Sequence, residues 1–155
     1  MKCVVAHADA PVFHSAMVLL AAQLVGIAEA SLAMACEFAK TRVQFGKPIG
    51  VNQAVKHCCA DMAVAAESAL QQTMFAAICI NDSRADAEFQ TRTAKFIAGR
   101  SAIDNASAGI QLHGGMGFTW EHDIHLYLER ARVLDLLLGS RTEQLTELLR
   151  LPTPV

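Results

Sequence analysis

Three proline-free stretches, each about 30 residues long, constrain the fold of this chain more than any other feature of its sequence. The first runs from Phe13 to Arg42 and is rich in Ala, Leu and Met. It is interrupted at residues 44–50, where two glycines and a proline favour a turn. In the second and third stretches, apolar residues recur every three or four positions, which is typical of helices that bury one face. The pattern therefore predicts three helices, each on the order of 45 Å long.

Shorter segments complete the helical pattern. The Asn-Asp-Ser run at residues 81–83 is expected to close the second helix and to cap the third. The glycines at residues 114–117 end the third helix. A fourth helix is predicted over residues 121–138, and Gly139-Ser140 separates it from a short C-terminal helix that reaches Arg150. Strand signals are nearly absent, because the chain has no Asn-Gly turn and no sustained alternation of β-branched residues.

Long antiparallel helices joined by short loops are typical of up-and-down bundles. We therefore predict an all-α fold over residues 13–150: an up-and-down four-helix bundle with a short extra C-terminal helix. Residues 1–12 are interpreted as a linker or the remnant of a preceding region, and residues 151–155 as a tail. The apolar stripes predict these buried positions: Val55, Cys58, Met62, Ala65, Ala69 and Thr73 in the second helix, and Phe89, Phe96, Ile103, Ala106 and Ile110 in the third.

The composition excludes two classes of protein. With 53% hydrophobic and only 18% charged residues, the 155-residue chain can bury enough apolar area to fold as one domain, so disorder is excluded. A net charge of -2 without a Lys/Arg cluster argues against nucleic acid as a partner. The surplus of apolar residues over charged ones indicates surface that a partner covers.

The cysteines and the N-terminal sequence predict a cytoplasmic protein. The five cysteines form no C-x-x-C pair, and their odd number fits reduced thiols in the core rather than disulfides. No secretory signal opens the chain. The stretch from Ala16 to Cys36 is long enough to cross a bilayer, but Gln23 and Glu29 interrupt it, so we expect a core helix and no membrane span. The five cysteines are Cys3, Cys36, Cys58, Cys59 and Cys79.

Metal and hydrolase chemistry are poorly supported. His122 and His125 are three residues apart on a predicted helix, near Glu121 and Glu129, at a spacing that can bind zinc or iron. A di-metal bundle, however, needs carboxylates from several helices, and no Glu-x-x-His motif occurs. We therefore expect solvated or helix-end histidines and no metal. A serine hydrolase would need a G-x-S-x-G turn after a strand, which is also missing.

Two loop segments are candidates for ligand binding. Arg42-Val43-Gln44-Phe45-Gly46 places a cation, an amide and an aromatic ring at a helix end, where Arg suits a pyrophosphate and Phe a flat ring. Arg42 serves equally well to neutralise the negative end of the helix. The Gly114-Gly115-Met116-Gly117 segment lacks the preceding strand of phosphate-binding loops, so by itself it is interpreted as a helix cap and turn.

Taken together, these motifs resemble the C-terminal domain of the acyl-CoA dehydrogenase family, from about Phe13 to Arg150. The resemblance is carried by the following segments, in this order along the chain: Arg42-Val43-Gln44-Phe45-Gly46-Lys47-Pro48-Ile49, Gln53, Ala60-Asp61-Met62, Gln111-Leu112-His113-Gly114-Gly115-Met116-Gly117-Phe118-Thr119, and the helix end from Ala131 to Ser140.

The resemblance implies a four-helix bundle that forms the core of an oligomer and one wall of a site for FAD. In the family, the Arg-x-x-Phe-Gly turn and the Gln-x-x-Gly-Gly motif contact the partner subunit's FAD, and the segment after the fourth helix approaches the flavin of its own site. FAD would thus be shared with absent domains or with a partner subunit. The FAD-binding residues implied here are Arg42, Gln44, Phe45, Gln53, Gln111, Gly114, Gly115 and Ser140, where Ser140 stands in place of a Thr.

The resemblance also implies a reaction, α,β-dehydrogenation of an acyl-CoA thioester, in which a carboxylate removes the α-proton. This chain departs from the family at that carboxylate. The usual Glu-Gly-Thr is Leu138-Gly139-Ser140, and the alternative position on the first helix is Ala16, followed by Met17. Asp135 lies one turn before Leu138, but nothing in the sequence brings it to the site. We therefore expect no catalytic residue in this chain.

Three functions remain open. The chain is interpreted first as the C-terminal domain of an acyl-CoA dehydrogenase, of fatty acid or sterol side-chain metabolism, whose base is lost or supplied by a partner. The family's N-terminal and middle β domains are missing, so the bundle alone is expected to be incompetent in catalysis. The second interpretation is a non-catalytic assembly subunit of a heteromeric dehydrogenase, and the third is a branch with other flavin chemistry. The expected partners are copies of the chain or a related subunit, and acyl-CoA.

Overall fold

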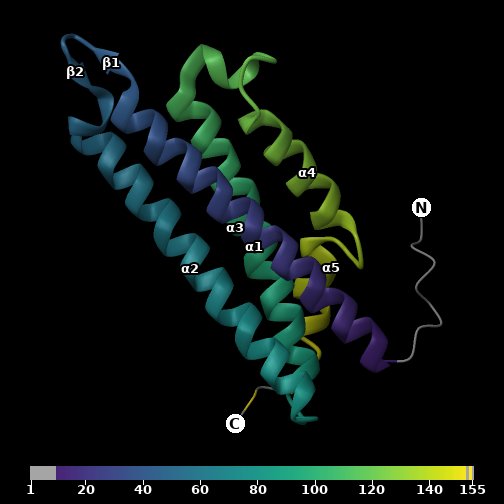
Figure 1. Ribbon diagram of the computed structural model, residues 1–155. Helices are drawn as coiled ribbons and strands as arrows, with labels where there is room; N and C mark the ends of the chain where they lie inside the picture. Colours follow the sequence, from purple (N-terminus) through teal and green to yellow (C-terminus); the bar gives the residue numbers. More distant parts are fainter. Residues whose placement is uncertain (1–9, 153, 155) are drawn as a thin grey trace.

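The computed structural model describes residues 10–152 and residue 154. Four helices run alternately up and down, and a short fifth helix packs beside them (Figure 1). The predicted all-α, up-and-down bundle with an extra C-terminal helix is therefore confirmed. The elements are α1 (Ala10–Thr41), β1 (Val43–Gln44), β2 (Lys47–Pro48), η1 (Ile49–Val51), α2 (Gln53–Asn81), α3 (Ala87–His113), η2 (Gly114–Phe118), α4 (Ile124–Leu136) and α5 (Arg141–Leu148), where η marks a 3₁₀ turn.

Helix α3 is the centre of the bundle, because it contacts α1, α2, α4 and α5. Its inner face is lined by Ala94, Ala98, Ala102 and Ala106, all fully buried. Such small side chains let neighbouring helices approach closely, and larger residues such as Leu24 of α1 fill the core around them. The predicted stripe of α3 was right at Ala106 and Ile110, and Ile103 is half-buried but packs against the core. Phe89 and Phe96 are only half-buried. In α2 the buried predicted residues are Met62, Ala69 and Thr73.

The break after α1 is a tight hairpin, which the apolar pattern did not predict. Strands β1 and β2 pair antiparallel, with Val43 opposite Pro48 and Gln44 opposite Lys47. The two turn residues, Phe45 and Gly46, have φ angles of 50° and 76°. Two consecutive positive φ angles are typical of type I′ hairpin turns. The familiar Asn-Gly signal is missing because a phenylalanine occupies the first position of the turn.

Three predicted boundaries need correction. The fourth helix begins at Ile124 and ends at Leu136, so it is shorter than residues 121–138 at both ends. Asp82 ends α2 as predicted, but the residue before α3 is Asp86 rather than Ser83, and its side chain makes no capping hydrogen bond. Residues 10–12 belong to α1 instead of a linker. Residues 1–9, 153 and 155 lie outside the described part, so the interpretation of those residues as linker and tail stays a prediction.

Helices α1 and α2 are each long and apolar enough to cross a membrane, by length and composition alone. The core helices of a bundle pass the same test, and α1 here packs on α2, α3 and α4. Among the described cysteines only Cys79 is fully buried, whereas Cys36, Cys58 and Cys59 are half-buried and free. Burial, together with the neighbouring Cys36 thiol, raises the pKa of Cys59 to about 11, so this thiol stays protonated at neutral pH.

Candidate functional site

The hairpin presents an aromatic ring that nothing in the described chain covers. Phe45 is fully exposed, at 103% of its reference area, at the tip of the β1–β2 turn. Arg42 precedes β1, and its backbone is fixed on both sides: its N–H donates to Phe38 O at 2.8 Å, and its C=O accepts from Ile49 N at 2.9 Å. The Arg42 side chain is exposed and takes part in none of the ion pairs found among residues 10–152. The hairpin thus holds a cation and an aromatic ring ready for an external partner.

A glycine turn ends α3 at the same end of the bundle (Figure 1). Gly114 caps the helix with φ 61° and ψ −136°, a conformation that L-residues adopt only with strain. Gly117 is needed for packing, because a Cβ there would lie 2.7 Å from Ile110 O. Gly115 has neither constraint, since its φ is not positive and a Cβ would meet nothing within 4 Å. The protein itself therefore gives no steric reason for glycine at position 115, whereas the approach of a ligand would give one.

Three packed rings, of which Phe38 and His113 are stacked and His122 is tilted, join the hairpin end of α1 to the glycine turn of α3. The ring centroids of Phe38 and His113 are 4.2 Å apart, and those of His113 and His122 are 4.1 Å apart. His113 Nδ1 lies 2.7 Å from Gly109 O, which fixes the ring plane. Burial lowers the pKa of His113, and the neighbouring His122 lowers it further, against the raising effect of the Gly109 contact. The stack therefore joins the two loop segments through a neutral imidazole.

The structure brings seven of the eight predicted site residues to this end of the bundle. Gln53 is the first residue of α2, directly after the hairpin and η1, and its side chain is exposed. Gln111 is exposed in the last turn of α3. The seven residues are Arg42, Gln44, Phe45, Gln53, Gln111, Gly114 and Gly115.

Ser140 lies apart from the other seven predicted residues. It follows α4 and sits beside Lys95 of α3, because Lys95 Nζ donates to the neighbouring Gly139 O at 2.7 Å. Lys95 and His113 are 18 positions apart on α3, which corresponds to about 27 Å along the helix axis. Ser140 also has a structural role, since it forms a capping box with Glu143. The Glu143 backbone N–H donates to Ser140 Oγ, while Ser140 N donates to Glu143 Oε2 at 2.8 Å.

The positions at which the family carries its base hold no acidic side chain. Leu138, in the turn after α4, is half-buried with φ 57°. On α1, Ala16 is half-buried and the following Met17 is fully buried. The nearest carboxylate, Asp135, is committed to ion pairs: its Oδ2 accepts from Arg141 Nε at 3.1 Å, and its Oδ1 is 4.0 Å from Lys95 Nζ. The geometry therefore gives Asp135 no free role as a base.

Metal binding finds no support in the described residues, in which no group of three or more His, Cys, Asp or Glu side chains is arranged to hold an ion. His122 instead packs in the ring stack, and its Nδ1 accepts a hydrogen bond from Ile124 N at 3.2 Å. His125 packs edge-on against Trp120 with centroids 5.1 Å apart.

The seven grouped residues fit one part of FAD, the pyrophosphate with the adenosine. A guanidinium, three amide side chains and an open Gly115 backbone are suited to phosphate oxygens and hydroxyl groups, and Phe45 offers an apolar face to a base. Ser140 and its neighbours form a second candidate patch, apart from the first. The chain therefore presents two separated patches instead of one enclosed cofactor site.

Sequence reasoning missed a buried polar cluster around the turn that follows α4. Lys95 and Gln144 are almost completely buried, and their side chains donate to backbone carbonyls of this turn, Gly139 O and Leu138 O. Asn105 is buried further along α3, where it donates to Ala28 O of α1. One signal was available for Lys95, because it falls within the stripe of small residues that forms the inner face of α3. The glycines and the proline of residues 44–50 predicted a turn there, but nothing in the sequence predicted a type I′ hairpin.

Comparisons with known proteins show which family the chain and its fold resemble. Residues 10–150 match the family model described as "Acyl-CoA dehydrogenase, C-terminal domain". The acyl-CoA dehydrogenase IpdE2 of Mycobacterium tuberculosis is 41% identical over 140 residues, which are 90% of this chain but 42% of that protein. In the ChsE4–ChsE5 complex of the same species, one chain superposes with a TM-score of 0.84 at 30% identity, over 92% of this chain and 39% of that one. A structure of PigA with FAD and proline gives a TM-score of 0.84 at 26% identity, over 89% and 36%.

Proposed function

Because this chain belongs to the acyl-CoA dehydrogenase family, through its C-terminal domain, we propose that it acts as the C-terminal helical part of an FAD-dependent assembly that oxidises acyl-CoA thioesters. In this proposal the bundle contributes oligomer interfaces and contacts to FAD, and it lacks the usual glutamate. The chain spans 42% of the length of IpdE2, so the remaining parts of the site come from other domains or another subunit.

The observation that carries the proposal is the fully exposed Phe45 at the tip of a hairpin that begins directly after the exposed Arg42. Exposing a whole phenylalanine forgoes about 2 kcal/mol of burial free energy, so a partner surface or a ligand is expected to cover it. The ring lies outside the bundle at the tip of the β1–β2 turn, and the guanidinium of Arg42, three residues earlier, favours an anionic group. An aromatic ring beside a cation suits the adenosine and pyrophosphate of FAD.

The residues at the hairpin end have distinct roles in this proposal. Arg42 pairs with the pyrophosphate as a fixed cation, and Gln44, Gln53 and Gln111 supply amide hydrogen bonds that orient the cofactor. Gly115 lets the backbone approach it without a side chain in between. FAD, when bound, supplies a hydride acceptor for the β-carbon of the acyl chain. These residues contact the FAD of a partner subunit, whereas Ser140 lies at the other patch, where its hydroxyl group is expected near the flavin of the chain's own site.

Proton removal requires a group that this chain does not provide. Leu138 occupies the position of the family's base and has no proton acceptor, and Asp135 is held by Arg141 and Lys95. We therefore infer that, in a dehydrogenase, a related subunit carrying a glutamate supplies the base. Heteromeric arrangements exist among the relatives, as in the ChsE4–ChsE5 complex.

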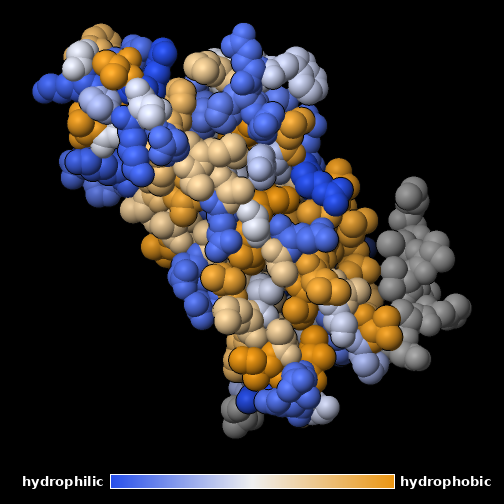
Figure 2. All heavy atoms as spheres, in the orientation of Figure 1, coloured by the Kyte–Doolittle hydropathy of each residue, from blue (hydrophilic) through white to orange (hydrophobic). Residues whose placement is uncertain are grey.

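Two other functions stand beside this one. The first is a non-catalytic assembly subunit, which is favoured by large apolar side chains exposed along α2. The face that carries α1 and α2 shows apolar residues over its lower part and polar ones at the hairpin end (Figure 2). The second is a family branch with different flavin chemistry. Such chemistry needs no base for an α-proton, so it is compatible with the leucine at position 138. The exposed apolar residues of α2 are Val64, Met74, Phe75 and Ile78.

Co-purification with a related dehydrogenase subunit tests the proposal. The complex is scanned for flavin absorbance and assayed for acyl-CoA-dependent dye reduction. The dehydrogenase function predicts a yellow complex that reduces the dye. A stable but colourless complex would support the assembly function instead, and a yellow complex without acyl-CoA activity would support other flavin chemistry. A cytoplasmic location belongs to the same proposal, and fractionation of the host cell tests it.

A further inference from the structure

The turn between α4 and α5 has a backbone that its own sequence does not favour. Leu138 and Gly139 have φ angles of 57° and 101°. The second is ordinary for glycine, but leucine in the left-handed region carries a strain of about 1 kcal/mol or more. Such a conformation persists only where the surrounding residues hold it in place.

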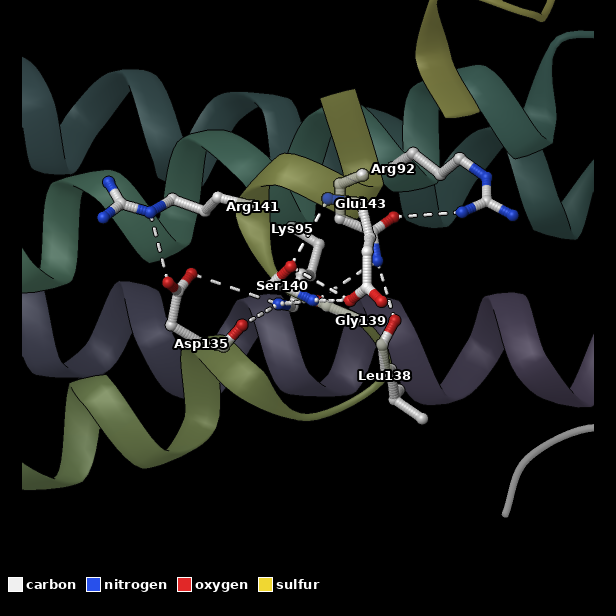
Figure 3. Close-up of polar contacts among 9 residues, drawn as sticks. Arg92, Lys95, Asp135, Leu138, Gly139, Ser140, Arg141 and Glu143 are labelled. Carbon is white, nitrogen blue, oxygen red and sulfur yellow. Dashed lines mark hydrogen bonds and ion pairs between the residues drawn. The ribbon is translucent and has the colours of Figure 1, made fainter. Parts of the chain in front are cut away.

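Lys95 is the first of the groups that hold this turn. It is fully buried on α3, and its ammonium group donates to two backbone oxygens, Asp135 O in the last turn of α4 and Gly139 O in the turn itself. The Asp135 carboxylate, with Oδ1 at 4.0 Å, adds charge compensation. Figure 3 shows the ammonium group between these acceptors. Burial lowers the pKa of Lys95, and the Asp135 carboxylate acts against that decrease. A charged lysine at this buried position therefore costs free energy unless its ammonium group is paired and hydrogen-bonded.

Gln144 is the second such group and acts from α5. It is 1% exposed, and its Nε2 donates to Leu138 O at 2.7 Å. Its Oε1 accepts from Arg92 Nη1 at 3.1 Å, and Arg92 is paired with Glu88 at 2.8 Å. The carbonyls of residues 138 and 139 therefore both accept from buried side chains that lie outside the turn.

A glycine on α3, Gly99, leaves room for the Asp135 carboxylate next to Lys95. A Cβ at Gly99 would lie 2.1 Å from Asp135 Oδ1, so only glycine leaves room for this carboxylate. Gly99 is one helical turn beyond Lys95, on the same face of α3. The lysine, the glycine and the carboxylate thus form one unit against the end of α4. A methionine would fill the space of Lys95 without burying a charge, so the lysine is best explained by its donors to the turn.

We propose that Lys95 is a positioning residue: by donating to Asp135 O and Gly139 O, it fixes the Leu138–Gly139–Ser140 turn in the orientation presented to the flavin. The inference rests on the proposed function, which places this turn at the flavin end of the site. It adds a residue that touches neither substrate nor cofactor and acts through the backbone of the turn.

The first experiment compares Lys95→Met with Asn105→Leu in the full 155-residue chain. Asn105 is a matched control, because it is also buried on α3 and donates to two carbonyls, Ala28 O and Met62 O, but these belong to α1 and α2. Amide hydrogen exchange and backbone chemical shifts are read at Ser140 and Gln144. In Lys95→Met we expect exchange at these amides to be about tenfold faster than in Asn105→Leu, with loss of the positive φ at Leu138.

Equal exchange in the two variants, with Leu138 unchanged, would overturn the proposal. If Lys95→Met does not fold, Lys95→Gln replaces it, because it keeps a hydrogen-bond donor on a shorter side chain. Amide exchange at Ser140 and Gln144 and the φ angle of Leu138 are then compared between Lys95→Gln and Asn105→Leu. Retained positive φ with unchanged exchange in that variant would also overturn the proposal, because a shorter donor cannot reach both carbonyls.

The second experiment uses the flavin-loaded assembly and reads the absorbance envelope of the bound flavin. We expect Lys95→Met to shift the envelope at unchanged flavin stoichiometry and Asn105→Leu to leave it unchanged. A disturbed turn with an unshifted envelope would show that the turn does not face the flavin, which overturns the positioning role. An assembly without flavin, by contrast, contradicts the proposed function, while exchange in the free chain still decides whether Lys95 holds the turn.

Discussion

The rings of Phe38 and His113 stack with centroids 4.2 Å apart, which joins the last turns of α1 and α3. Each residue lies close before a candidate binding segment: Phe38 is four residues before Arg42 and the hairpin, and His113 directly precedes the Gly114–Gly115 turn. The stack therefore sets the relative position of two loops that are about 70 residues apart in sequence. In our account, the bundle end binds FAD as one preformed surface because this stack keeps the loops together.

Removing one ring of the stack should weaken both the fold and the binding surface. For Phe38→Ala we expect a loss of about 2 kcal/mol in the free energy of unfolding, below the range for a fully buried phenylalanine because Phe38 is half-buried. Urea denaturation measures this loss. Phe118→Ala is the control, since Phe118 is 75% exposed and its removal should change stability by less than about 0.5 kcal/mol. Equal effects of the two substitutions would contradict the packing role of the stack.

The depressed pKa of His113 predicts that acid destabilises the protein. The unfolded chain takes up a proton near the ordinary histidine pKa of 6.5, whereas the folded state resists protonation because the ring is buried. Stability from the neutral ring is therefore fully present above pH 6.5 and falls as the pH decreases below that value. Urea titrations between pH 7.5 and about 5 measure the slope.

His113→Phe serves as the test variant, because it keeps a ring in the stack and removes the titrating group. It should flatten the slope without abolishing it, since burial also lowers the pKa of His14. An identical slope in His113→Phe and the wild type would assign the acid sensitivity to other groups.

The sequence was sufficient for the large features of the fold. The three long helices, the glycine turn after His113 and the short last helix followed from apolar spacing and from glycine and proline breaks, which act locally. The inner face of α3 was harder to predict. Its buried residues are mainly small or polar, such as Ala98, Gly99 and Asn105, so a search for large apolar residues selected Phe89 and Phe96 instead.

The candidate site was only partly accessible from the sequence. Motifs pointed to Arg42 and Gly115 because glycines and a cation at helix ends have local meaning. The grouping of these loops, by contrast, depends on the tertiary stack of Phe38 on His113. The role of Lys95 was also hidden, because its acceptors lie 40 and 44 positions further along the chain.

Two glycine substitutions should affect different properties, one the stability of the fold and the other the retention of flavin. Gly99→Ala forces a Cβ against Asp135 Oδ1, so we expect a loss of about 2 kcal/mol in stability. Gly115→Ala meets open space, and stability should stay within about 0.5 kcal/mol of the wild type, while flavin retention in the assembly decreases. Thermal unfolding and flavin absorbance separate the two effects. Full flavin retention in Gly115→Ala would remove this glycine from the proposed site.

Leu138→Glu tests whether the turn after α4 faces a reacting acyl chain. A carboxylate there, in an apolar site, should have a raised pKa and remove the α-proton of a bound thioester. In the flavin-loaded assembly we expect exchange of the acyl-CoA α-protons with solvent deuterium above the wild-type level, measured by mass spectrometry. Leu137→Glu, one residue earlier, is the control and should show no gain. No gain in Leu138→Glu would contradict the placement of this turn at the acyl chain.

The most direct test of the account is the flavin content of the assembly when Arg42 is replaced. Arg42→Ala is compared with Arg100→Ala, because Arg100 is an exposed arginine of α3 whose only ion pair within residues 10–152 is with Asp104 on the same helix. Each complex is purified identically, and its ratio of flavin to protein is measured by absorbance. We expect a marked loss of flavin in Arg42→Ala and full occupancy in Arg100→Ala. Full occupancy in both variants would contradict the claim that the hairpin end of the bundle binds FAD.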